Sequence, residues 1–260
     1  MLKIVEGILE GDRRSLSRAI SIIDNEENNY QEIIRQIFKK TGKALTIGFT
    51  GPGGAGKSSL IGKLVSEFKK YDYKIAIIAV DPSSPFTGGA ILGDRIRMQE
   101  NIMDHSDIFM RSIASRGAIG GISKSLRNII RILEAGGYNL ILVESVGAGQ
   151  LEIEVSKVVN LTIVLFTPNT GDKVQAIKAG ITEIGDVYII NKSDIDGANT
   201  LYNTVKDLIG ETDKKPIILK CSAKTGNGVR EVAETLNKIL NNESDNFKKK
   251  ENALLESELK

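Results

Sequence analysis

The sequence has almost none of the residues that build disulfide frameworks or zinc centres. Cys221 is the one cysteine and His105 the one histidine in 260 residues. An internal disulfide is therefore excluded, and there is no Cys/His cluster for a structural zinc or for a metal that the chain delivers. A lone cysteine fits a reducing compartment, so we expect a cytoplasmic protein.

Long hydrophobic runs and a strong charge of one sign are also missing. The longest apolar runs, such as residues 161–166, have the length of a strand and fall far short of the roughly 20 residues that cross a bilayer. Lys3, Glu6 and Glu10 interrupt the region that a signal peptide would need to be apolar. The net charge is +2, from 35 basic and 33 acidic residues, so we expect neither a nucleic-acid partner nor a membrane partner.

From residue 44 onward the sequence consists of short apolar, β-branched runs separated by longer helical patterns. Continuously apolar strands that alternate with helices predict an α/β fold, with a mostly parallel central sheet and helices on both faces. Ligands of such sheets bind at the carboxyl ends of the strands. The runs that predict strands are residues 44–50, 74–80, 108–114, 139–145, 161–167, 187–191 and 216–222.

The two ends of the chain differ from this central part. Apolar residues at helical spacing predict a short helical extension over residues 1–43, with Asp12 and Asn25 as helix N-caps. We expect residues 44–242 to form the main domain. Residues 243–260 are mostly polar and charged, which predicts a solvated tail.

The turn after the first predicted strand carries a phosphate-binding pattern. Residues 51–58, GPGGAGKS, match G-x-x-x-x-G-K-[ST] between a strand and a helix. Glycines let backbone N–H groups turn toward phosphates, and the N-terminus of the helix adds a favourable dipole. Lys57 should reach the β and γ phosphates, and the Ser58 hydroxyl should bind Mg²⁺. The predicted nucleotide-binding residues of this P-loop are Gly51, Pro52, Gly53, Gly54, Ala55, Gly56, Lys57, Ser58 and Ser59.

A second motif predicts which base is bound. The sequence Asn191-Lys192-Ser193-Asp194 follows another apolar strand and matches N-K-x-D. A carboxylate at Asp194 can accept two hydrogen bonds from guanine, and adenine offers neither in that position, so an unpaired buried carboxylate would reject it. After the next strand come Ser222, Ala223 and Lys224, the S-A-K loop that completes guanine sites. We therefore expect GTP and GDP as ligands in preference to ATP.

Acidic residues at strand ends are the remaining candidates for metal binding and catalysis. Glu144 lies at the end of a predicted strand and Gly147 follows three residues later. The two residues therefore take the places of the aspartate and the glycine in the usual D-x-x-G motif. Glu144 can bind Mg²⁺ or orient the attacking water, and the alternative is a carboxylate that only caps the strand. Asp81 and Asp94 bracket an irregular loop that Mg²⁺ and a γ-phosphate can order. Asp94 can instead be the N-cap of the helix that follows.

With these residues the chain resembles the MeaB/ArgK family, the GTPases associated with methylmalonyl-CoA mutase, within the dimer-forming SIMIBI class of P-loop proteins. The loop DPSSPFTGGAILGDRIRM is the most specific segment of the resemblance. The other segments are EGDRRSLSRAISIID, GPGGAGKSS, RSIASRGAIGG, VESVGAGQLE, GDKVQAIKAG and NKSD. The resemblance implies that Asp81, Asp94 and Glu144 are metal-site acids. It also implies that Asp172 and Lys178 lie in an additional switch, where they help couple partner binding to GTP hydrolysis.

The resemblance further implies a chaperone that hydrolyses GTP slowly alone, gates adenosylcobalamin loading of methylmalonyl-CoA mutase, and protects or reactivates that enzyme as a homodimer. Two features depart from the family. Ala118 stands where many relatives have histidine, and little sequence follows the helix predicted at 229–240, where relatives carry a dimerisation arm. Three alternatives stay open: a P-loop kinase linked to amino-acid transport, a GTPase for metal-centre insertion, and a nucleotide-gated scaffold.

Overall fold

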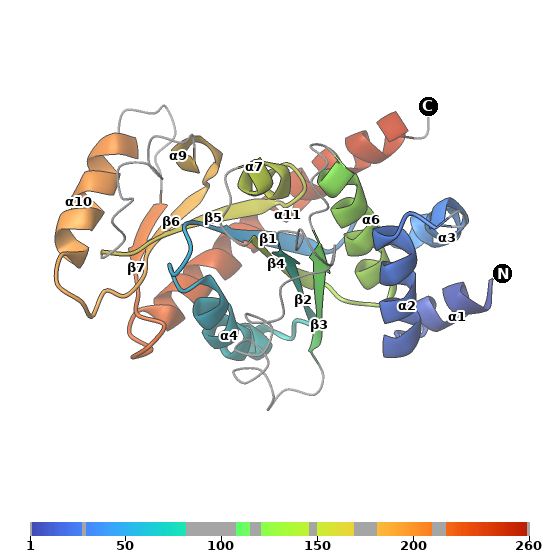
Figure 1. Ribbon diagram of the computed structural model, residues 1–260, viewed down its shortest axis with the longest axis horizontal. Helices are drawn as coiled ribbons and strands as arrows, with labels where there is room; N and C mark the ends of the chain where they lie inside the picture. The colour runs from blue at the N-terminus through green and yellow to red at the C-terminus, as the bar shows by residue number, and fades with distance from the viewer. Residues whose placement is uncertain are drawn as a thin grey trace, which may run out of the picture.

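A seven-stranded sheet lies at the centre of the molecule (Figure 1). The computed structural model describes residues 2–27, 30–81, 108–114, 121–145, 150–168, 181–209 and 217–258. The strand order is β3-β2-β4-β1-β5-β6-β7, and every pairing is parallel. The strands are β1 (Leu45–Thr50), β2 (Ile75–Asp81), β3 (Phe109–Ala114), β4 (Leu140–Ser145), β5 (Leu161–Phe166), β6 (Val187–Ile190) and β7 (Ile217–Lys220). Each coincides with one predicted run to within two residues at either end, which confirms the α/β fold class.

Helices cover both faces of the sheet, because alternate strand residues point to opposite sides. Ile47 and Phe49 of β1 pack with α4 (Lys57–Phe68) and α11 (Val229–Glu258) in one core. Ile141 and Val143 of β4 pack on the other face with α6 (Gly121–Ala135) and α7 (Gln150–Ser156). A third, smaller cluster joins β5 and β6 to α10 (Ala198–Ile209). The short segments are η1 (Phe38–Lys40), η2 (Lys69–Tyr71) and α9 (Ile181–Ile184).

Three N-terminal helices extend the second core beyond α6 (Figure 1). They are α1 (Lys3–Leu9), α2 (Arg13–Asp24) and α3 (Tyr30–Ile37). Asp12 is the N-cap of α2, as predicted, because its carboxylate accepts a hydrogen bond of 2.8 Å from the backbone N of Ser15. The same prediction for Asn25 is wrong. The apolar face of α2 continues through Ile23, so Asn25 is the C-cap of that helix and donates its N–H to Ser21 O.

The last helix passes residue 243 without a break. Helix α11 runs from Val229 to Glu258, and Phe247 packs against the core formed by β1, α4 and α11. The division of the chain into an extension, a main domain and a tail stays a prediction. Among the described residues, no helix is both long enough and apolar enough to cross a bilayer.

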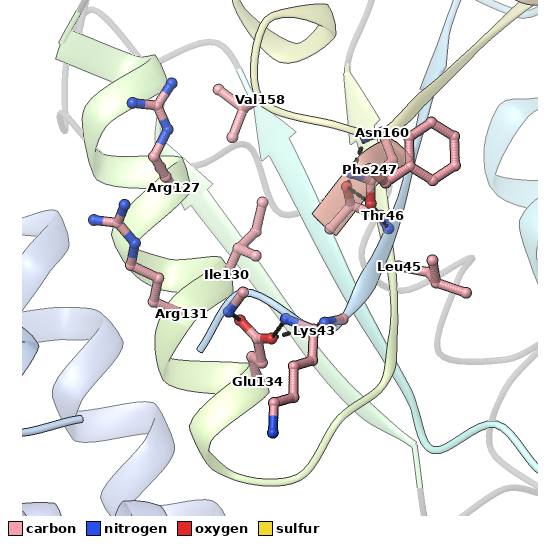
Figure 2. Close-up of a pocket in the computed structure, with 12 residues that line it drawn as sticks. Lys43, Leu45, Thr46, Arg127, Ile130, Arg131, Glu134, Val158, Asn160 and Phe247 are labelled. Carbon is pink, nitrogen blue, oxygen red and sulfur yellow. Dashed lines mark hydrogen bonds between the residues drawn. The ribbon is translucent and has the colours of Figure 1, made fainter. Parts of the chain in front are cut away.

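One carboxylate fixes the chain where it enters the central strand. Glu134, near the end of α6, accepts hydrogen bonds from the backbone N of Gly42 at 2.8 Å, of Ala44 at 2.7 Å, and of Lys43. Figure 2 shows this carboxylate turned toward Lys43, while Arg127 and Arg131 leave the helix in another direction. Helix α6 therefore sets the position from which β1 carries the chain to its phosphate-binding turn.

Candidate functional site

The glycine-rich turn lies at the carboxyl end of β1 and leads directly into α4. Gly56 is the N-cap of α4 with φ +86°, and Gly54 has φ +75°, a left-handed conformation that suits glycine. A Cβ at Gly54 would meet no atom within 4 Å, whereas a Cβ at Gly56 would lie 2.4 Å from Asn191 Nδ2. The turn is thus open at Gly54 and tightly packed at Gly56, where it lies against Asn191 at the carboxyl end of β6.

Lys57 folds back over the turn that it follows. Its side chain is 6% exposed, and Nζ donates hydrogen bonds to Gly51 O at 2.8 Å and Pro52 O at 3.2 Å. Ser59, two residues after Lys57, is exposed. The ammonium group is therefore held across the loop by backbone carbonyls, where an incoming phosphate can compete for it.

Three of the four residues predicted to bind Mg²⁺ lie in the described part of the chain and come from three neighbouring elements. Ser58 Oγ at the start of α4 donates a 2.7 Å hydrogen bond to Glu144 Oε1 at the end of β4. Asp81 ends the adjacent strand β2, and both acids are 4% exposed. Hard oxygen donors suit Mg²⁺, which needs few protein ligands, so this donor set fits the ion. Among the described residues no three His, Cys, Asp or Glu side chains form a ready metal cluster.

Asn191 joins the phosphate loop to the loop after β7. It is 1% exposed, and its Nδ2 donates to Ala55 O at 2.8 Å and to Gly56 O at 3.5 Å. Its Oδ1 accepts a 3.1 Å hydrogen bond from the backbone N of Ala223. One amide side chain thus satisfies backbone groups of two loops that are far apart in sequence.

The predicted base-binding carboxylate lies beside this bridge. A hydrogen bond from Ser222 is the main reason that the pKa of Asp194 is lowered, and the charges of Lys224 and Lys192 act in the same direction. Ser222 is buried while Lys224 is exposed, and Lys192 has a left-handed φ of 56°. The carboxylate is therefore ionised at neutral pH and suited to accept hydrogen bonds from the edge of a base.

Sequence reasoning gave no role to Glu152, which the structure buries beneath the phosphate loop. Its side chain is 1% exposed on α7, and Oε1 accepts a 3.4 Å hydrogen bond from Gly51 N. Burial raises the pKa of this carboxyl, against the lowering effects of Thr50, the Gly51 amide and Lys57. No sequence signal marks Glu152, because the buried face of α7 contains two acids, Glu152 and Glu154, beside Leu151 and Val155.

Four predicted residues cannot be placed in this geometry. Asp94, Gly147, Asp172 and Lys178 lie outside the described residues. The described part of the site therefore unites the phosphate loop, two of the predicted metal-site acids and both segments of the predicted base site. A cleft of about 580 Å³ between α3 and α6 includes none of the predicted site residues in its described lining.

A turn of this kind between a parallel strand and a helix, bridged by an asparagine to a second loop, defines a P-loop nucleotide-binding protein of the GTPase type. The family model described as methylmalonyl Co-A mutase-associated GTPase MeaB matches residues 16–257. The chain belongs to this family, and guanine-nucleotide binding follows from that membership.

Relatives and solved structures agree with the family. A protein of Pyrococcus abyssi described as a GTPase is 40% identical over 269 aligned positions, covering 99% of this chain and 82% of the relative. GTPase ArgK of Escherichia coli is 34% identical over 240 positions, covering 88% and 72%. A crystal structure of an LAO/AO transport system kinase has a TM-score of 0.76 at 24% identity, covering 99% of this chain and 82% of that one. At that identity the structural likeness shows the fold.

Proposed function

We propose that the protein binds GTP with Mg²⁺, hydrolyses it slowly alone, and uses the cycle to gate adenosylcobalamin loading of methylmalonyl-CoA mutase and to protect or reactivate that enzyme. The observation that carries the nucleotide part is the Asn191 bridge, which fixes a phosphate loop and a base loop relative to each other. The description of the family, which names the mutase, supports the partner.

Lys57 is the residue that responds first to a bound triphosphate. Its Nζ holds two loop carbonyls, and phosphate oxygens are stronger acceptors for an ammonium group because both partners are charged. On binding, the ammonium group moves onto the β and γ phosphates, where it offsets the charge of the transferring phosphoryl group while water attacks in line. The loop amides add to that stabilisation without large rearrangement.

Ser58, Asp81 and Glu144 are the described residues that would hold Mg²⁺, together with Asp94. The bound ion would neutralise charge on the β and γ phosphates. Binding requires Ser58 Oγ to exchange its hydrogen bond to Glu144 for the metal. Glu144 is then available to bind the metal through water or to orient the attacking water.

The mutase acts on this cycle through the additional switch that the family resemblance implies. We assign Asp172 and Lys178 to a switch that couples mutase binding to hydrolysis, and Gly147 to nucleotide binding. The working form is a homodimer in the cytoplasm. Intrinsic turnover is slow because the chain offers no arginine finger in the described site, so acceleration waits for the partner.

GTP turnover by the purified protein, alone and with an adenosylcobalamin-dependent methylmalonyl-CoA mutase from the same source, tests the proposal. We expect slow GTP-specific hydrolysis that the mutase accelerates, and little turnover of ATP. Lys57→Met is the control for phosphate chemistry, and it should abolish turnover with and without the mutase. Unchanged turnover and no complex with the mutase would refute the partner, while phosphate on an acceptor instead of in solution would favour a kinase.

A further inference from the structure

A buried acid beneath the phosphate loop has no part in the scheme above. Glu152 reaches from α7 to the amide of Gly51 at 3.4 Å. The opposite side of Gly51 lies against β5, where an added Cβ would meet Leu165 O at 2.3 Å. Gly51 O in turn accepts the 2.8 Å hydrogen bond from Lys57. The first residue of the loop is therefore held between β5, the loop lysine and a carboxyl group of α7.

The hydrogen-bonding capacity of this acid is only half used. Glu152 Oε2 and the nearby Thr50 Oγ1 are both buried, and neither makes a hydrogen bond of normal geometry. Burying polar atoms without partners costs free energy, and in native proteins such atoms call for an explanation beyond packing. An apolar residue at this point of α7 would fill the core without that cost.

A second acid on the same helix shows the difference. Glu154 is 4% exposed, but it accepts a hydrogen bond from Ser123 of α6 and pairs with Lys157 at 2.7 Å. Glu154 therefore joins α7 to α6, away from the nucleotide, whereas Glu152 joins α7 to the phosphate loop. Helix α7 also follows β4, the strand that carries the predicted metal-site residue Glu144 next to its last residue.

We propose that Glu152 is a positioning residue that fastens helix α7 to the base of the phosphate loop, so that the loop keeps its catalytic shape only while α7 is in place. The residue acts through the Gly51 amide and touches no reacting atom. This inference rests on the proposed GTP hydrolysis.

Burial raises the pKa of Glu152 and so favours the uncharged carboxyl group. As an O–H donor it can satisfy Thr50 Oγ1 while its other oxygen still accepts from Gly51 N. The hydrogen bonds with Thr50 and with the Gly51 amide, and the charge of Lys57, act in the other direction and favour the carboxylate. Because the folded pKa is raised above the ordinary 4.5, the stability that the neutral group contributes is complete below pH 4.5 and declines as pH rises through the raised pKa.

Glu152→Gln and Glu152→Ala test the role, with Glu154→Gln as the matched control on the same helix. Glutamine keeps both the acceptor and a donor, so its kcat for GTP should stay within about threefold of the wild type. Alanine releases α7 from the loop and should lower kcat by about tenfold to a hundredfold, with a smaller change in KM. Glu154→Gln should lower the thermal midpoint but leave kcat near the wild-type value.

The pH dependence of unfolding is a further readout, and the kcat values of the variants and of the wild type distinguish failure of this inference from failure of the proposed function. The unfolding midpoint of Glu152→Gln should depend less on pH than that of the wild type between pH 4.5 and 8, since glutamine does not titrate. Equal kcat in Glu152→Ala and wild type, or equal losses in the Glu152→Gln and Glu152→Ala variants, would overturn the inference. A wild-type protein without GTP hydrolysis would instead refute the proposed function.

Discussion

Replacing Asn191 with alanine tests the bridge between the two nucleotide loops most directly. The substitution removes the 2.8 Å bond to Ala55 O and the 3.1 Å bond from Ala223 N, both of them buried. The loss of each bond leaves a buried backbone group, Ala55 O or Ala223 N, without this partner, which costs about 1–3 kcal/mol of stability. We therefore expect the free energy of unfolding to fall by about 3 kcal/mol, roughly a hundredfold in the folding equilibrium constant.

Denaturant unfolding without nucleotide measures this loss, because both bonds are present in the ligand-free protein. GDP titration then measures the second effect, a weaker affinity that follows from losing the fixed spacing between Ala55 and Ala223. Asn199→Ala is the matched control, since Asn199 accepts a 2.9 Å bond from Lys220 at an exposed site and should cost less than about 0.5 kcal/mol. Stability and GDP affinity equal to the control would refute the bridge.

Three other substitutions or modifications give distinct expectations. Gly56→Ala places a Cβ 2.4 Å from the side chain of Asn191 and should lower the unfolding midpoint more than Gly54→Ala, which shares the left-handed φ but faces open space; equal midpoints would contradict the clash. Asp194→Asn should weaken GTP binding by tenfold or more. It should also improve binding of xanthosine triphosphate, because the 2-oxo group of that base can accept a hydrogen bond from the asparagine amide. Nucleotide competition measures both affinities, and an unchanged GTP affinity would show that Asp194 is not part of the base site. Burial raises the pKa of the Cys221 thiol to about 12, so a thiol reagent at pH 8 should label the native protein far more slowly than the unfolded one; equal rates would contradict its burial.

The fold could be predicted from the sequence because its signals are local. Each apolar run is short and ends at glycine or a polar cluster, so the alternation of strands and helices gives a parallel sheet without knowledge of long-range contacts. The N-cap at Asp12 was correct for the same reason. The error at Asn25 came from the polar cluster around it, because such a cluster can end one helix as well as begin the next.

The site was less accessible to this reasoning where its contacts are between distant segments. Spacing indicated that Lys57 follows the loop, but the fold-back of its ammonium group onto Gly51 and Pro52 depends on the three-dimensional path of the turn. The role of Asn191 as a bridge to Ala55 likewise needs the strand order, which brings β1 and β6 to either side of β5. Glu152 was missed because a buried acid in a short helix has the same sequence pattern as a surface one.

The position of β1 within the strand order separates two tasks across the width of the sheet. Strands β4 and β2 on one side carry Glu144 and Asp81 at their carboxyl ends, whereas β6 and β7 on the other lead into the Asn191 and Ser222 loops. The proposed function thus assigns recognition of the base and the chemistry at the phosphates to different halves of the protein, which meet at one loop. A designer can therefore alter which nucleotide is read while leaving the hydrolytic half intact, and use an orthogonal nucleotide to drive this GTPase alone among many.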